Sequence, residues 1–169
     1  MTNTKLKLGI IFGGRSGEHA VSLMSASSVR SVLDPSKYEV FEIGVTQEGA
    51  WLTGSNALKA FKEGKQESLP EALLLNTAGK VSLYSRQGNT LKLISPLDVV
   101  FPVLHGTFGE DGTIQGYFEM LDLAYVGAGV LASAVGMDKA VCKHVVQNAG
   151  IPVLEFIVFS RSEIRTNLA

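Results

Sequence analysis

Glycine is concentrated in three short stretches of this chain, and their positions constrain the fold more than any other feature. Ten of the 18 glycines lie at 13–17, 106–116 and 127–136. The first two stretches follow short apolar runs, at 6–12 and 98–104, that are typical of buried parallel strands. Clustered glycine marks loops in which the backbone turns tightly or approaches a ligand. We therefore expect two ligand-facing loops at the ends of two strands.

The order of elements around the first loop predicts the fold class. The run 6–12 is followed by a helical segment from about His19 to Leu33 and by a second strand, Glu39 to Thr46. This β-loop-α-β order predicts an α/β fold with an open, mostly parallel, doubly wound, Rossmann-like sheet. Three apolar residues form the helix stripe that we expect to face the sheet: Val21, Met24 and Val32.

The rest of the chain is predicted to add a hairpin insertion and further helices. The insertion begins near residue 47, and its runs 81–84 and 90–94 flank a turn at 86–89. Later segments predict two helices, at 114–121 and 138–149, and two strands, at 124–126 and 153–159. No element is expected over 160–169.

Composition excludes several classes of protein. The net charge is −1 and 46% of residues are hydrophobic, which argues against a disordered chain or a nucleic-acid-binding one. A single cysteine, Cys142, cannot form an internal disulfide. The sequence also contains neither a signal-peptide pattern nor an apolar run of membrane-spanning length. We expect a cytoplasmic protein that binds neither nucleic acid nor membrane.

The first glycine loop does not match a dinucleotide-binding fingerprint. That pattern requires glycine at position 12, where Phe12 stands, and an acidic residue after the second strand, where the chain has Val45-Thr46. Glu18 also places a carboxylate at the start of a helix, where it would repel phosphate and attract an ammonium group. The alternative is that Glu18 only complements the helix dipole. His19 is expected to be a surface or capping residue.

The second glycine loop begins with His105 at the end of a buried strand. An imidazole at this edge could hold a carboxylate or relay a proton. Glu110 and Asp111 need not face each other as an acid–base pair, and Asp111 or Thr113 is expected to cap the next helix. The alternative is that the whole loop is a glycine-shaped turn without chemistry.

Lys139 is the candidate for an anionic ligand in the C-terminal part. It lies in the first turn of a predicted helix, where a cation is unfavourable unless it serves a group such as phosphate. A solvated lysine is the alternative. Cys142 and His144 are two residues apart on that helix and point to different faces, so we expect no metal site.

Three motifs together resemble the N-terminal part of the D-alanine–D-alanine ligases, a family of the ATP-grasp superfamily. They are Gly13-Gly14-Arg15-Ser16-Gly17-Glu18-His19 with Val21-Ser22, the run His105 to Gly116, and Gly127 to Ala134 with Met137-Asp138-Lys139. The resemblance runs from about Leu8 to Phe159. Ala20 departs from it, because family members usually carry a second acidic residue there.

The resemblance implies a function and a set of site residues. Glu18 is implied to hold the ammonium group of the first D-alanine, with His105 beside it as the second catalytic residue. Val21 and Ser22 are implied to line the same substrate site, and Lys139 to contact ATP phosphates. The implied reaction joins two D-alanines for peptidoglycan precursors, with ATP and Mg²⁺ (or Mn²⁺), through an acyl-phosphate.

The resemblance also divides the chain and sets its expected limits. Residues 1–127 are expected to form a substrate-side domain, and 128–169 the start of an ATP-grasp domain. Because the family's metal ligands lie further on, we expect the isolated chain to be incomplete and inactive. A homodimer is expected, and the second substrate, D-alanine, D-lactate or D-serine, stays open. The alternative is a stand-alone Rossmann-like or flavodoxin-like binding module, in which 138–149 and 153–159 would be firmly packed.

Overall fold

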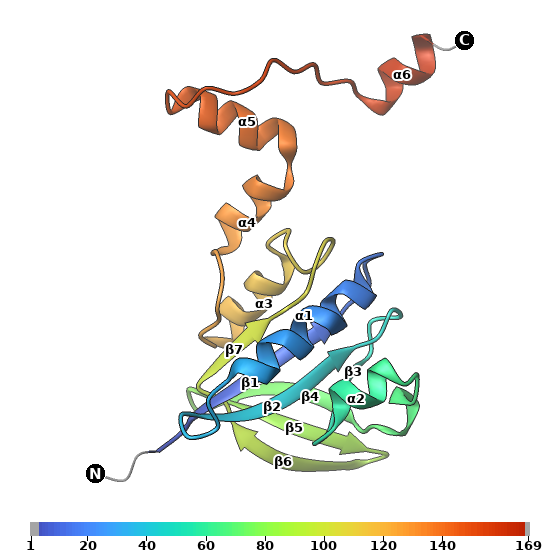
Figure 1. The fold of residues 1–169 in the computed structure, drawn as a ribbon, viewed down its shortest axis with the longest axis vertical. Helices are drawn as coiled ribbons and strands as arrows, with labels where there is room; N and C mark the ends of the chain where they lie inside the picture. Colours follow the sequence, from blue (N-terminus) through green and yellow to red (C-terminus); the bar gives the residue numbers. More distant parts are fainter. Residues whose placement is uncertain (1–3, 168–169) are drawn as a thin grey trace.

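The chain folds around one seven-stranded sheet with helices on both faces, in a computed structural model that describes residues 4–167 (Figure 1). The strands are β1 (Leu6–Gly13), β2 (Tyr38–Val45), β3 (Trp51–Thr53), β4 (Glu71–Thr77), β5 (Lys80–Gln87), β6 (Thr90–Pro96) and β7 (Val99–Pro102). The helices are α1 (His19–Val32), α2 (Ala57–Lys62), η1 (Gln66–Ser68), α3 (Thr113–Leu121), α4 (Val130–Met137), α5 (Lys139–Asn148) and α6 (Arg161–Asn167). The strand order is β6-β5-β4-β3-β2-β1-β7.

Three strands form the parallel part of the sheet that the sequence predicts. β1 lies between β2 and β7 and pairs in parallel with both. Every residue of β1 from Leu8 to Gly13 is buried, because α1 and α2 cover one face and α3 the other. An apolar run without alternation is the pattern expected of a strand covered on both faces. The predicted α/β class and the first two strands are therefore confirmed.

The parallel part is smaller than expected, because the insertion extends the same sheet in antiparallel fashion. Of the six strand pairings within residues 4–167, two are parallel and four antiparallel. The predicted hairpin is present as β5 and β6, joined at Gln87 and Thr90. β4 was not predicted. Its apolar run, Ala72 to Leu75, carries no clear alternation, and it becomes a strand by pairing with β5.

Helix α1 packs on the sheet through a different face from the predicted one. Val21, Met24 and Val32 are 49%, 69% and 82% exposed, so the predicted stripe is wrong. The buried face instead carries Ser22, Leu23 and Ala26. Small side chains let the helix lie close to β1, and one of them, Ser22, satisfies backbone groups there. A search for large apolar residues overlooks such a face.

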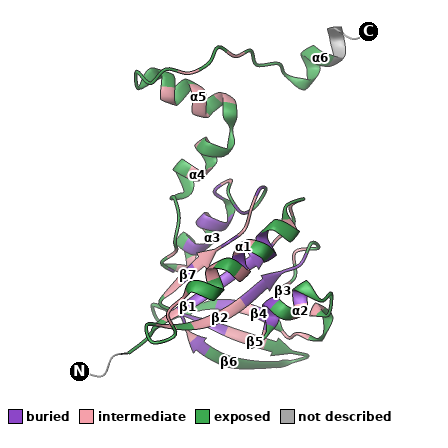
Figure 2. Cartoon of the chain, viewed as in Figure 1, coloured by how far each residue is buried: buried purple, intermediate pink, exposed green. Residues whose placement is uncertain are grey.

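The last quarter of the described chain, from α4 onward, extends away from the sheet (Figure 1). No residue of α4 or α5 is buried, and Figure 2 shows these helices mostly exposed. The strand predicted at 153–159 is wrong, since the segment 151–160 has no regular structure and none of the described strands lies beside it to pair with. Residues 161–167 form the helix α6, although no element was expected there. Within residues 4–167, no helix combines the length and apolarity of a membrane span.

We predict that Gly44→Ala destabilises the fold. A Cβ at Gly44 would collide with the ring of Phe61, which packs edge-on against Phe12 at 5.4 Å between centroids. Displacing that ring should lower the free energy of unfolding by about 1–3 kcal/mol in urea titrations. Gly116→Ala is the control, because nothing lies within 4 Å of its added Cβ inside α3, and it should raise stability by about 0.5–1 kcal/mol. Equal stability of the two variants would contradict the packing described here.

Candidate functional site

Two glycine loops meet at the carboxyl ends of β1 and β7. The two strands are parallel neighbours, with Ile11 opposite Pro102, so the loops that follow them leave the same edge of the sheet. This edge is where open α/β sheets bind ligands. The loops that the sequence singles out separately therefore form one site.

A buried serine joins the roots of the two loops. The hydroxyl of Ser22, on α1, accepts a hydrogen bond from the Gly13 N–H at 2.8 Å and donates one to the Val103 carbonyl at 2.5 Å. Ser22 is completely buried. Because both backbone groups lie where the strands end, this one side chain fixes β1, β7 and α1 relative to one another.

A second serine joins the loops further out. The Ser16 hydroxyl donates to the His105 carbonyl at 2.6 Å and accepts from the Glu18 N–H at 3.1 Å. Gly106 has a positive φ of 70°, and a Cβ there would lie 2.8 Å from Oε2 of Glu18. Glycine at this position thus lets the Glu18 carboxylate lie directly against the second loop.

Glu18 presents a negative charge that nothing in the described chain neutralises. It precedes α1 as the N-cap residue and is exposed, and no hydrogen bond or ion pair from residues 4–167 reaches its carboxylate. A carboxylate at a helix N-terminus opposes phosphate binding there. The edge is therefore suited to a cation such as an ammonium group.

His105 is held from the α1 side. Its Nε2 lies 3.1 Å from the Ser25 hydroxyl, and its ring is half-buried. No described residue bonds Nδ1, which leaves that nitrogen for a ligand. Sequence reasoning missed both Ser16 and Ser25 as site residues. Their signal was weak, because serine is common in loops and on helices, and only the fold brings them to the histidine.

The two acidic residues of the second loop accept hydrogen bonds from backbone N–H groups and do not act as a pair. Glu110 accepts from the Gly106 N–H at 2.6 Å, and Asp111 accepts from Phe108 and Thr113 at 2.9 and 3.0 Å. The expected cap at Asp111 or Thr113 is wrong, because Gly112 is the N-cap residue of α3, although Asp111 accepts from the first N–H of the helix. Partial burial raises the pKa of Asp111, but these hydrogen bonds outweigh it, so its pKa lies below the ordinary 3.8.

The remaining predicted site residues lie in different places. Val21 follows Glu18 on the exposed side of α1, whereas the Ser22 hydroxyl is already occupied by backbone groups. His19, expected at the surface or as a cap, is half-buried, with Nδ1 2.8 Å from the Gly14 carbonyl. Lys139 begins α5 and is exposed, and Figure 1 shows that helix beyond α4, away from the two loops. The structure thus brings Glu18 and His105 together but not Lys139.

The described residues do not fit a metal ion. Among residues 4–167, no three His, Cys, Asp or Glu side chains cluster in a way that could hold one. The ring of His144 packs instead against Phe156, at 5.0 Å between centroids. No step of a reaction is therefore assigned to a metal held by this part of the chain.

Comparison with known proteins gives a consistent result. Residues 7–128 match the family model for the D-ala D-ala ligase N-terminus. A D-alanine–D-alanine ligase from Natranaerobius thermophilus is 42% identical over 160 residues, covering 94% of this chain and 43% of that protein. The VanG D-Ala:D-Ser ligase from Enterococcus faecalis superposes with a TM-score of 0.79 at 32% identity, covering 98% of this chain and 48% of that one. The D-alanine-D-alanine ligase from Coxiella burnetii gives 0.76 at 32% identity, covering 97% and 48%. The chain spans less than half the length of these relatives.

We predict that Ser22→Ala lowers the free energy of unfolding by about 2 kcal/mol, because it leaves a buried N–H and a buried carbonyl without their partner. Urea unfolding measures the change. Ser28→Ala on the exposed side of the same helix is the matched control and should change stability by less than about 0.5 kcal/mol. A Ser22→Ala protein as stable as the control would show that the hydroxyl does not join the loops.

The lowered pKa of Asp111 predicts an acid-sensitive second loop. A carboxyl with a depressed pKa stabilises the fold above its unfolded pKa, and this contribution is lost as the pH falls through the folded value. Stability should therefore fall on acidification below the ordinary 3.8, and fall less steeply in Asp111→Asn. Urea unfolding at a series of acidic pH values measures both slopes. Identical slopes would exclude this role for Asp111.

Proposed function

Because the chain belongs to the D-alanine–D-alanine ligase family, we propose that it forms the part of such a ligase that binds the first D-alanine. The observation that carries this proposal is the Glu18 carboxylate, which has no partner among residues 4–167 and lies against Gly106 at the edge where His105 also lies. A zwitterionic amino acid offers an ammonium group that Glu18 can bind and a carboxylate that His105 can bind. The site has both chemistries within one pair of joined loops.

The proposed reaction of the whole ligase is ATP-dependent joining of two D-alanines for peptidoglycan precursors. ATP phosphorylates the carboxylate of the first D-alanine, and the amine of the second attacks the resulting acyl-phosphate and releases phosphate. Such a reaction depends on holding the reacting groups in position and on balancing the charge that develops. The family-level resemblance supports this sequence of steps.

Each residue at the edge has a proposed task. Glu18 binds the ammonium group of the first D-alanine, which turns the substrate carboxylate away from this negative charge. His105, oriented by Ser25, donates a hydrogen bond through its free ring nitrogen to a substrate oxygen. Val21 offers an apolar contact on the same helix. We propose a positioning role for Ser22, since its hydroxyl proton is already donated to Val103.

The C-terminal part has a separate proposed task. We propose that residues 1–127 form the substrate-side domain and that 128–169 begin the ATP-grasp domain, where Lys139 meets the phosphates of ATP. The family match ends at residue 128, which supports the boundary. The lack of buried residues in α4 and α5 disfavours a stand-alone binding module. A homodimer in the cytoplasm and the use of Mg²⁺ are proposed from the family resemblance alone.

We predict that the 169-residue chain binds D-alanine through Glu18. In NMR titrations, D-alanine should shift the amide signals of Glu18 and Gly106, and Glu18→Gln should weaken binding about tenfold by removing a charged hydrogen bond. Glu39→Gln is the matched control. Glu39 is an exposed carboxylate near the start of β2, at the edge of the sheet remote from the two loops, so this substitution should leave binding unchanged. Equal affinity of the two variants would contradict the assignment. With D-alanine and Mg·ATP, the same polypeptide should release no ADP.

A further inference from the structure

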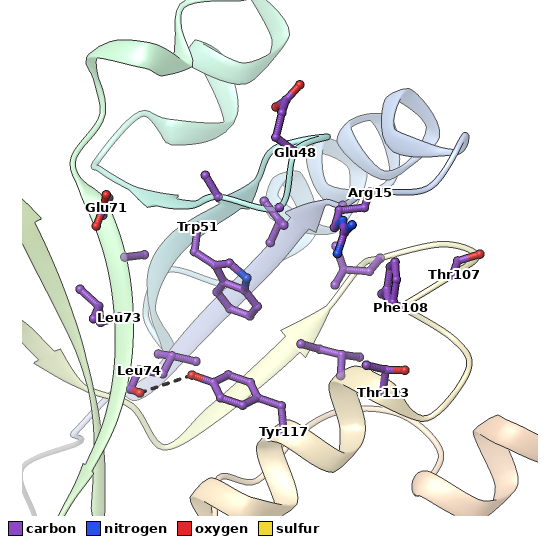
Figure 3. A pocket seen from close by; sticks show the side chains of 18 of the residues that line it. Arg15, Glu48, Trp51, Glu71, Leu73, Leu74, Thr107, Phe108, Thr113 and Tyr117 are labelled. Carbon is purple, nitrogen blue, oxygen red and sulfur yellow. Dashed lines mark hydrogen bonds between the residues drawn. The ribbon is translucent and has the colours of Figure 1, made fainter.

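A large apolar cavity lies on the opposite face of the sheet from α1. It has a volume of about 660 Å³ and lies between α3, β4 and the turn that precedes β3. Neither Glu18 nor any residue of α1 lines it. Figure 3 shows side chains from these elements pointing into the same space. A cavity of this size falls in the range of small-molecule sites.

The walls of the cavity are aromatic and aliphatic. Trp51 and Tyr117 pack against each other edge-to-face, with their ring centroids 5.8 Å apart, and together form one aromatic wall of the cavity. The buried side chains of Leu74 and Ile114 supply aliphatic surface. The Tyr117 hydroxyl donates to the Leu74 carbonyl at 3.4 Å, and burial raises its pKa, so the phenol stays neutral. These walls favour an apolar body with an aromatic ring.

One cation without an acidic partner stands at the mouth of the cavity. The guanidinium of Arg15 lies 4.8 Å from the centroid of the Phe108 ring, and within residues 4–167 it makes no ion pair. Figure 3 shows it turned toward Phe108, whereas the carboxylates of Glu48 and Glu71 lie at the outer edges of the cavity. Glu71 forms an ion pair with Arg86, which does not line the cavity. A guanidinium stacked on a ring keeps its edge N–H groups for a carboxylate.

We propose that this cavity is a binding site for a small molecule with an apolar, ring-bearing body and one carboxylate. The body lies against the aromatic wall that Trp51 and Tyr117 form together, and the carboxylate accepts hydrogen bonds from Arg15. Arg15 belongs to the first glycine loop and Phe108 to the second, so the occupant contacts the back of both loops that carry Glu18 and His105. His105 lines this cavity as well as the edge that carries Glu18, and the proposal does not depend on ligase activity.

The test uses the full 169-residue chain and 4-phenylbutyrate as the probe. Trp51 is the only tryptophan, so its indole N–H gives one NMR signal that needs no assignment. That signal should shift with 4-phenylbutyrate and saturate, together with the amide signals of Phe108 and Gly109. The uncharged 4-phenylbutyramide should bind about tenfold more weakly, because it loses the charged hydrogen bonds to Arg15. Equal binding of acid and amide would overturn the proposed anion site.

Two variants and a control test the Arg15 anion site and the apolar cavity separately. Arg15→Gln should weaken binding of the acid about tenfold and leave binding of the amide unchanged. Ala50→Phe places a large ring at an exposed position in the cavity wall and should abolish binding of both. Arg30→Gln, which removes an exposed arginine on α1, should bind like the unmodified chain. Unchanged affinity in both cavity variants would overturn the site.

A competing occupant has its own signature. If a second copy of the chain fills the cavity, the Trp51 signal of the ligand-free protein will shift with protein concentration and 4-phenylbutyrate will not saturate it. That result would overturn the small-molecule assignment. A concentration-independent Trp51 signal that responds to the acid through Arg15 supports it.

Discussion

The arrangement of the candidate site depends on the hydroxyl group of Ser22. It accepts from the backbone where β1 ends and donates to the backbone just after β7, from a completely buried position on α1. Unpaired backbone groups in the interior are costly, so this side chain holds two strand ends and a helix in one geometry. The two glycine loops start from these fixed points. Ser16 then joins them again further out, between Glu18 and His105.

With the loops fixed, electrostatics determines what the edge can bind. The Glu18 carboxylate lies at a helix N-terminus without a cationic partner in the described chain, so the position that many α/β sheets use for phosphate is suited here to an ammonium group. Arg15, three residues earlier, faces the other side of the sheet and offers a positive charge to the apolar cavity. The same loop thus presents opposite charges to two adjoining sites, and His105 borders both of them.

The fold was predictable where local sequence and tertiary packing agree. The apolar run of β1 and the glycines after it gave the parallel core and the position of the site. The predicted face of α1 was wrong because tight packing selects Ser22 and Ala26 over larger apolar residues. β4 and the segment 153–159 were misjudged because a strand exists only where a partner pairs with it, and a short sequence window does not contain the partner. Ser25 reaches His105 across 80 residues, so only the fold could reveal that contact.

We propose that the two loops form a site for an amino acid held through its ammonium group by Glu18. The most direct measurement is a crystal structure of the chain with D-alanine bound. The D-alanine nitrogen should lie about 3 Å from the Glu18 carboxylate, with His105 on the same side of the ligand. D-alanine bound elsewhere, or bound with its carboxylate rather than its nitrogen at Glu18, would contradict it.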